Sequence, residues 1–383
     1  MGEKHSKVCS QNSGSFEMFY PSSTQKIMSS RLKQIQADLE RSHSRLSQIK
    51  ADLQREQLSP VQFNNKQTQL PLHQNHENLP GFPYRIESSA QPIKIDAIEI
   101  TKTSSFGNSI QQLINVFYFC LNNNICKIYT RENFPYINSE VKISENKEIE
   151  LLVQRKPGNA EVLLSGRFFS PKQLNCTYSS DEYVNIFDKY VLPRIKLPVS
   201  PITVSDTDLV IHFRSGDIFA NSSPHPNYGQ PPLSFYQKVI EQEKPTRCIL
   251  VFEDRGNVCI EQVEDFLTNH SIPFICQSSD VYSDIACLKS SVNLILARGT
   301  FGDAITLLTN RLKKVYFFEN LYKFELALLR GAKVFRVSDK TGEFKSQLLT
   351  KNWKNTEEQK KMMLNYDASN LEMQNLTKTD RIW

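Results

Sequence analysis

Short apolar runs recur between about residues 93 and 350, and amphipathic, helix-like stretches separate most of them. The runs are IDAIEI (95–100), KIYT (127–130), DLVIHF (208–213), RCILVFE (247–253), IPFIC (272–276), VNLILA (292–297), KKVYFF (313–318) and AKVFRV (332–337). Strands that alternate with helices in this way indicate parallel sheets with helices on both faces. No other feature of the sequence constrains the fold as strongly, and it predicts the α/β class.

The apolar runs fall into two groups, which the stretch 131–205 separates. We therefore expect two doubly wound domains facing a cleft, one over 93–205 and one over 206–350. Residues 351–383 are polar and helix-prone, and are expected to form a helical tail. A length of 383 residues is sufficient for two such domains and additional segments.

The N-terminal region has a different character. Residues 1–24 are rich in Ser and Asn and are predicted to be disordered. Residues 25–58 carry an apolar heptad stripe in which RLKQIQADL recurs fourteen residues later as RLSQIKADL. The stripe predicts a coiled coil that makes the protein a homo-oligomer, and the alternative is one amphipathic helix packed on its own domain. Residues 59–92, rich in Gln, Asn, His and Pro, read as a linker.

Charge and hydropathy exclude several classes of function. The net charge of +5, from 46 Lys and Arg against 41 Asp and Glu, is too dilute for a nucleic-acid-binding protein. No run approaches the 18 apolar residues of a membrane span, and the first thirty residues hold no secretory apolar segment. We expect a cytoplasmic protein, although Met1-Gly2 with Ser6 fits a myristoylation pattern formally.

The cysteines suggest a reducing compartment as well. The sequence has eight cysteines and no C-x-x-C pair. Buried, reduced thiols are therefore expected at the five that lie among apolar residues, which are Cys120, Cys248, Cys259, Cys276 and Cys287.

The strongest chemical signal is the motif His212-Phe213-Arg214-Ser215-Gly216-Asp217, which ends the strand-like run 208–213. Ligands of open α/β sheets bind at the carboxyl ends of the strands. At that place Arg214 offers a forked donor to a phosphate, and His212 lies on the same side of the strand. Gly216 permits a sharp turn, and Asp217 can accept backbone N–H bonds. The combination suits a diphosphate leaving group, whereas the alternative is a surface Arg–Asp pair.

Two weaker signals accompany this motif. Ala297-Arg298-Gly299-Thr300-Phe301-Gly302 follows the run 292–297 and precedes a helix, whose free N–H groups can bind an anion. Asp284 lies at the start of the preceding helix, where an aspartate is most often a cap. Phe106-Gly107-Asn108 with Gln111 precedes the first helix, expected at about 109–122, and is either a ligand-binding turn or only a tight turn.

Taken together, these motifs resemble the α-1,2-fucosyltransferase family, whose members use GDP-fucose. Residues 212–217 match its H-x-R-x-G-D motif in full, and residues 231–236 are similar to its proline- and tyrosine-containing helix start. The resemblance covers about 100–320. The sequence departs from the family at Gly299 and Gly302, which replace serines, and at Arg298, which replaces an asparagine.

The resemblance implies a GT-B-like fold of two Rossmann-like domains, a GDP-sugar donor, a glycan acceptor and no metal. It implies that Arg214 holds the β-phosphate, that His212 lies near the guanosine, and that Asp284 accepts from the guanine N–H groups. Phosphate oxygens would contact the turn at Thr300, Phe301 and Gly302, and the turn at Gly107 and Asn108 would approach the substrate.

The catalytic base and even the activity stay open. The candidates for the base are Asp217, Glu253, Asp254 and Asp303, and we favour Asp217. Asp206-Thr207-Asp208 has the D-x-D form of a metal–diphosphate motif, but it precedes its strand and is interpreted as a solvated turn. The competing hypothesis is a non-catalytic scaffold with a sugar-nucleotide fold, oligomerised through 25–58.

Overall fold

The structure is a computed structural model in which a defined part of the chain is described. That part comprises residues 94–102, 105–134, 136–137, 149–153, 158, 162–319 and 325–377. All of it belongs to one compact unit, Gln67–Trp383. The predicted disordered segment 1–24 and the coiled coil 25–58 lie outside the described residues, as does the linker 59–92.

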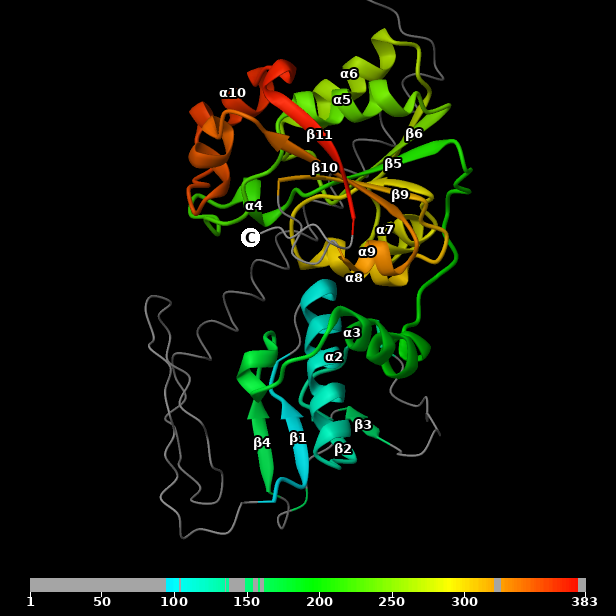
Figure 1. Cartoon of the computed structure of the whole chain (residues 1–383), viewed down its shortest axis with the longest axis vertical. Coiled ribbons are helices and arrows are strands. Elements are labelled where there is room, and N and C mark those ends of the chain that lie inside the picture. The colour runs from blue at the N-terminus through cyan, green and yellow to red at the C-terminus, as the bar shows by residue number, and fades with distance from the viewer. Residues whose placement is uncertain are drawn as a thin grey trace, which may run out of the picture. The chain divides into compact units, whose positions relative to one another are not determined.

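A small parallel sheet opens the described chain. Its strands are β1 (Ala97–Ile100), β2 (Lys127–Thr130), β3 (Glu150–Val153) and β4 (Leu163–Gly166), in the order β3-β2-β1-β4. Helix α2 (Phe106–Asn122) connects β1 to β2 (Figure 1). The described chain then passes through α3 (Ser180–Ile186) and two short helical turns, Phe187–Val191 and Leu192–Arg194.

A larger sheet follows in the order β11-β10-β9-β8-β5-β6-β7. Its pairs are parallel except for β10 with β11. The strands are β5 (Asp208–Phe213), β6 (Arg247–Phe252), β7 (Phe274–Gln277), β8 (Asn293–Ile295), β9 (Lys314–Phe318), β10 (Lys333–Asp339) and β11 (Leu371–Leu376). Numbered from β5 as the first strand, β7 to β10 follow the order 3-2-1-4-5-6 of Rossmann domains.

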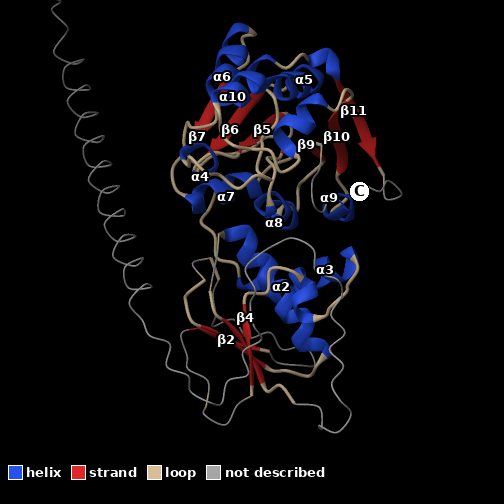
Figure 2. Ribbon diagram, turned by 90° about the vertical axis from the view of Figure 1, so that its left-hand side faces the viewer, coloured by secondary structure: helices blue, strands red, loops and turns tan. Residues whose placement is uncertain are grey.

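Helices cover both faces of the larger sheet. Helices α5 (Leu233–Glu243), α6 (Cys259–Asn269) and α10 (Glu357–Asn365) lie on one face, as both views show (Figures 1 and 2). Helices α7 (Val281–Lys289), α8 (Thr300–Leu308) and α9 (Glu325–Leu329) lie on the other. Burial on both faces explains why strands such as β5, in which every residue is buried, read as continuous apolar runs.

The side chains of β5 divide between two apolar clusters. Leu209, Ile211 and Phe213 join the cluster of α5, α6 and α10. Val210 joins the other cluster, which contains residues of α7, α8 and α9 and also residues of α2 and the small sheet. The period of two in a strand therefore turns His212 toward α8, the same side as Val210.

The predicted α/β class with two parallel sheets is confirmed. The expected runs overlap β1, β2 and β5 to β10, and the expected limits of β2 and β5 are those observed. The short strands β3 and β4 were not foreseen. The expected polar tail contains α10, but it also contains β11, which pairs antiparallel with β10 at the edge of the sheet.

Two further observations bear on the sequence predictions. None of the helices in the described ranges is long and apolar enough to cross a membrane. The cysteines of the described residues are free, and Cys120, Cys248, Cys259 and Cys287 are buried as expected. Cys276 is exposed, against expectation, because β7 is the edge strand; its thiol donates to Glu264 of α6.

Candidate functional site

The carboxyl ends of β5 and β8 form the point at which the strand order of the larger sheet reverses. From β5 the chain continues through β6 and β7 in one direction, and then returns to β8 on the other side of β5. Open α/β sheets bind ligands at such a switch point, because the loops leave it in opposite directions. The motif 212–217 follows β5 and the turn 297–302 follows β8. The structure thus brings the two strongest sequence signals to adjacent strands.

The loop after β5 is held by Asp254, which follows β6. One carboxylate oxygen of Asp254 accepts hydrogen bonds from the Ser215 hydroxyl and from the backbone N–H groups of Gly216 and Gly256. Burial would raise the pKa of Asp254, but these hydrogen bonds outweigh burial and lower that pKa. Asp217 was expected to accept such bonds, and that expectation is wrong: its side chain is 71% exposed and pairs with Arg214.

Arg214 is held between two carboxylates. Its guanidinium donates to Asp217, and its Nη1 lies 3.9 Å from Glu253 Oε2. Gly216 makes this close approach possible, because a Cβ at this residue would stand 2.2 Å from Glu253 Oε2. The φ of Gly216 is +65°, which glycine adopts without strain. The Arg214 side chain remains 32% exposed. An incoming phosphate would therefore compete with two carboxylates for this guanidinium.

His212 is buried beside the ring of Phe301. The two ring centroids lie 4.9 Å apart, and His212 Nδ1 has no hydrogen-bond partner among the described residues. Burial, with a smaller contribution from the positive charge of Arg214, lowers the pKa of His212 to about 3. The imidazole is therefore neutral at physiological pH, and it can offer a hydrogen bond but no charge.

Asp284 lies in the first turn of α7, but it does not cap the helix. Asp280 is the cap, and it accepts from the N–H groups of Tyr282 and Ser283. Asp284 accepts from Gln277 Nε2 at 3.0 Å. Burial, and then the nearby charges of Asp280 and Glu253, raise the pKa of Asp284, although the hydrogen bond from Gln277 partly offsets them.

The residues from the small-sheet half contact the first turn of α8. Gly107 belongs to the first turn of α2, not to a loop, and a Cβ there would stand 2.5 Å from the backbone of Thr300 and Phe301. The Thr300 hydroxyl donates to Asn108 Oδ1 at 2.7 Å. Packing between α2 and α8 therefore explains Gly107, and the Thr300 hydroxyl is already used within the protein.

The remaining predicted residues have structural surroundings. Gly302 is buried in the first turn of α8, where its N–H donates to the Gly299 carbonyl oxygen. Asp206 lies at the amino end of β5 and pairs with Arg311 and Lys313, as expected of a solvated turn. Asp208 is buried and pairs with Arg247, so this second carboxylate of the D-x-D pattern supports the fold.

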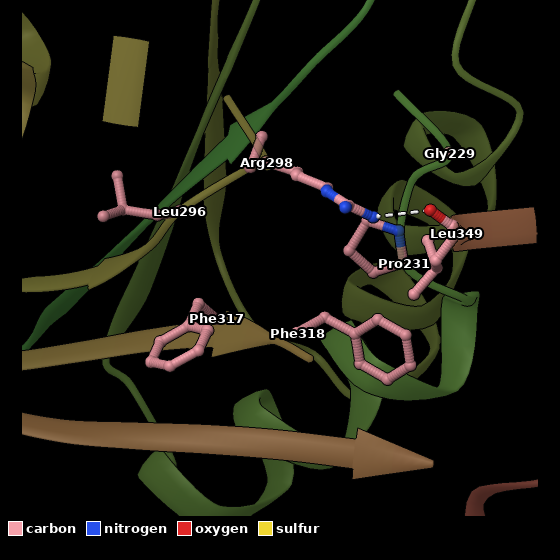
Figure 3. Close-up of a pocket in the computed structure, with 8 residues that line it drawn as sticks. Gly229, Pro231, Leu296, Arg298, Phe317, Phe318 and Leu349 are labelled. Atoms are coloured by element: carbon pink, nitrogen blue, oxygen red, sulfur yellow. Dashed lines mark hydrogen bonds between the residues drawn. The ribbon is translucent and has the colours of Figure 1, made fainter. Parts of the chain in front are cut away.

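A small pocket lies at the carboxyl ends of β8 and β9 (Figure 3). Only Ala297 and Arg298 of the turn 297–302 reach it, and none of the predicted site residues lines it. Figure 3 shows Arg298 extending toward Leu349, with Pro231 and the aromatic rings of β9 nearby. The lining residues are Gly229, Pro231, Leu296, Ala297, Arg298, Phe317, Phe318 and Leu349.

Known proteins that are similar to this chain are found among solved structures. No family model and no curated protein matches the sequence. Similar solved structures include fucosyltransferase NodZ from Bradyrhizobium, with 9% identity over 64% of this chain and 96% of that one, and a TM-score of 0.32. POFUT1 in complex with GDP-fucose has 9% identity over 59% and 98%, with a TM-score of 0.31. A family 9 glycosyl transferase from Veillonella parvula has 12% identity over 67% and 92%, with a TM-score of 0.35.

The first of these three structures is named a fucosyltransferase and the third a glycosyl transferase, and the second contains GDP-fucose. None of the three is named an α-1,2-fucosyltransferase, so the resemblance to that family depends on the motif residues alone. Similarity at this level carries no conclusion about the reaction. The described residues contain no group of three or more His, Cys, Asp or Glu arranged to hold a metal ion.

Sequence reasoning missed the roles of two residues. Asp254 was considered only as a catalytic base, and Asn257 was not considered. Asn257 Nδ2 donates to the Arg214 carbonyl oxygen at 3.0 Å, and its N–H donates to Ser215 Oγ at 3.1 Å. The available signal was the polar segment 253–257, because it directly follows β6, the neighbour of β5.

Proposed function

We propose that this protein is a glycosyltransferase that moves L-fucose from GDP-fucose to a hydroxyl group of a glycan, with inversion and without a metal. The observation that carries the proposal is the H-x-R-x-G-D motif at the carboxyl end of β5, beside β8 at the switch point of a Rossmann-type sheet. Arg214 follows this strand end with a partly exposed guanidinium, a group that pairs well with the phosphate of a departing diphosphate.

The reaction breaks the bond between C1 of fucose and an oxygen of the β-phosphate, and forms a bond from the acceptor oxygen to C1. Negative charge develops on GDP as it leaves. Arg214 would stabilise this charge, and it does so best in the transition state, where the charge is largest. Asp217 and Glu253 hold the guanidinium in place before the donor binds, and their pairing must weaken when the phosphate arrives.

Nucleotide recognition would involve His212 and Asp284. The neutral imidazole of His212 suits a contact with the uncharged guanosine better than a contact with phosphate. Asp284, in its ionised form, can accept two hydrogen bonds from the guanine N1–H and N2–H groups. Its partial burial strengthens such bonds, since they compete less with water.

The acceptor hydroxyl must lose its proton to a base. Asp254 is unsuited to this role, because its hydrogen bonds from the loop stabilise the carboxylate and lower its pKa. Asp217 and Glu253 are 71% and 66% exposed and lie beside Arg214. We keep Asp217 as the proposed base and expect Asp217→Asn to abolish transfer, with Glu253→Gln as the matched comparison.

The test is a donor screen with purified protein. GDP-fucose, GDP-mannose and UDP-sugars are compared by the free nucleotide released, with and without a chelator. We expect turnover with GDP-fucose that the chelator does not affect. Arg214→Ala should lower turnover roughly 10²–10³-fold, while Arg311→Ala, a charge change at the amino edge of the sheet, should not. Full activity of Arg214→Ala would refute the assignment, and strict Mn²⁺ dependence would refute the metal-free mechanism.

A second function, that of a non-catalytic scaffold, has one specific observation in its favour. Arg214 is the only positive charge that the motif 212–217 offers to a donor, and Asp217 and Glu253 already compensate it. A scaffold would need no free guanidinium. The two functions differ in outcome: a scaffold releases no nucleotide from any donor, even under conditions in which calorimetry detects bound GDP.

A further inference from the structure

The motif 212–217 leads directly into helix α4 (Asp217–Ala220), which is a single helical turn. Asp217, the proposed base, is the first residue of this helix. So short a helix forms few internal hydrogen bonds, and these do not offset the entropy that is lost when its backbone is ordered. The position of Asp217 therefore depends on contacts that other segments make with α4.

Two different segments hold the two parts of the motif region. After β6, Asp254 accepts from the N–H of Gly216. Asn257, three residues further along, donates to the Arg214 carbonyl oxygen at 3.0 Å. The side chains that donate to α4 belong to another segment, residues 350–356, which lies just before α10 in the chain. Arg214 and α4 are thus held from different sides.

Trp353 is the first of the two donors to α4. Its indole Nε1 donates to the Ile218 carbonyl oxygen at 3.0 Å, and its ring stands edge-on to that of Phe219 with the centroids 5.3 Å apart. Its backbone N–H donates to the Pro226 carbonyl oxygen at 3.1 Å, in the loop that follows α4. Because the Trp353 side chain is buried, these hydrogen bonds are sheltered from water.

Asn355 is the second donor. Its Nδ2 donates to the Phe219 carbonyl oxygen at 2.7 Å and to the Asn221 carbonyl oxygen at 3.3 Å. These oxygens lie at the C-terminal end of α4, where a helix has no internal partner for its carbonyl groups. The φ of Asn355 is +57°, a left-handed conformation that asparagine adopts more readily than most residues. Asparagine therefore suits both the backbone of this segment and the cap that it provides to α4.

The segment that carries both donors is fixed by α10. Gln359 of α10 accepts from the N–H of Lys354 at 2.8 Å through its Oε1. Its Nε2 donates to the Asn352 carbonyl oxygen at 2.6 Å. Because these two contacts flank Trp353 in the chain, the segment gives α4 a firm support.

We propose that Trp353 and Asn355 are positioning residues for the transfer reaction, which hold α4 and thereby set the position of the Asp217 carboxylate beside Arg214. The inference rests on the proposed function, in which Asp217 takes the proton of the acceptor hydroxyl. It gives a role in that function to a C-terminal segment that the sequence indicated only as a polar tail. Since Arg214 is held separately from the side of β6, loss of these contacts should impair proton transfer more than donor binding.

Hydrogen exchange and steady-state kinetics test this role in the full-length protein. Asn355→Gly removes the amide but permits the left-handed backbone. Trp353→Phe keeps a ring against Phe219 but removes the N–H donor. Lys351→Gly is the matched control, because Lys351 is exposed in the same segment and has a φ of +58°. Slow exchange of β5 and β6 in each variant verifies that the fold is intact.

We expect the N–H groups of residues 219–221 to exchange roughly tenfold faster in Asn355→Gly than in the wild type, because they bond within the turn of α4 that Asn355 caps. The kcat with GDP-fucose should fall roughly 10–100-fold, while its KM stays within about twofold. Trp353→Phe should have a smaller effect in the same direction. Lys351→Gly should change neither the exchange nor the kinetics.

Three results would overturn the proposal. The first is equal exchange of residues 219–221 in Asn355→Gly and the wild type, and the second is a raised KM with an unchanged kcat. The third is an equal fall of kcat in Lys351→Gly, because the effect would then come from the backbone of the segment. Exchange is measured without a donor, so it shows whether the segment holds α4 even if the wild type releases no nucleotide. That last outcome refutes the proposed function and, with it, the role of both residues in transfer.

Discussion

Replacement of His212 by glutamine should change how the stability of the protein depends on pH. The fold keeps this imidazole neutral by burial, and its pKa falls from an ordinary 6.5 to about 3. In the unfolded chain the imidazole titrates near 6.5. Between these two values the unfolded state binds a proton that the folded state does not, so stability is lost as the pH falls from 6.5 toward 3.

The magnitude follows from the same shift. A difference of about 3.5 pKa units corresponds to roughly 4–5 kcal/mol once the pH is below both values. Carboxylates also titrate at the lower end of this range, so the informative interval is pH 7.5 to 5. There the linkage relation gives a loss of about 2 kcal/mol attributable to His212.

Urea unfolding at pH 7.5, 6.5, 5.5 and 5.0 measures this loss. The wild type should lose about 2 kcal/mol more than His212→Gln over the interval, whatever the stability of the variant at pH 7.5. His225→Gln, which removes an exposed loop imidazole, is the control and should follow the wild type. Parallel curves for the wild type and His212→Gln would refute the conclusion that this imidazole is buried and neutral.

Three other changes have defined outcomes. Glu253→Gln removes a carboxylate 3.9 Å from Arg214, so calorimetry should detect GDP binding about fivefold tighter; unchanged affinity would mean that the pair does not compete with phosphate. Gly107→Ala places a methyl group against the backbone of α8 and should cost about 1–3 kcal/mol in urea unfolding; a neutral effect would contradict the close packing of α2 on α8. Asp284→Asn should stabilise the fold at pH 7 and weaken GDP binding. The pKa of Asp284 is raised in the fold, so the folded protein loses stability as the pH rises through that pKa and the carboxyl ionises. A variant that is less stable than the wild type at pH 7 would contradict the argument from burial.

The sequence predicted most of the larger sheet because burial on both faces makes its strands apolar throughout. β5 is the clearest case, since all six of its residues are buried and its expected limits are those observed. β4, by contrast, has only one buried residue among Leu163–Gly166 and contains Ser165, so its signal is weak. β11 is buried only at its two ends, Leu371 and Leu376, and carries Glu372 and Gln374 between them. This pattern suits an edge strand, but in the sequence it resembles a polar tail.

The candidate site was predicted in position but not in its contacts. Strand order places the segments after β5 and β8 together, and that follows from the alternation of strands and helices. The residue that a given side chain contacts could not be predicted, because it depends on the register between strands that are distant in sequence. Asp254 and Glu253 reach the loop of Arg214 only because β6 pairs with β5 from Asp208↔Arg247 to Phe213↔Phe252. No local pattern in the sequence contains that register.

The apolar cluster that joins α2 and the small sheet to α7, α8 and α9 has a consequence for any attempt to divide the protein. A fragment that begins at residue 206 would leave Ile305 and Leu308 without Phe117 and Ile114, which belong to the same cluster. Such a fragment would expose apolar surface to water and should aggregate or require detergent. The two halves are therefore expected to fold in one cooperative step. A destabilising substitution in either half should then lower the amount of folded protein as a whole.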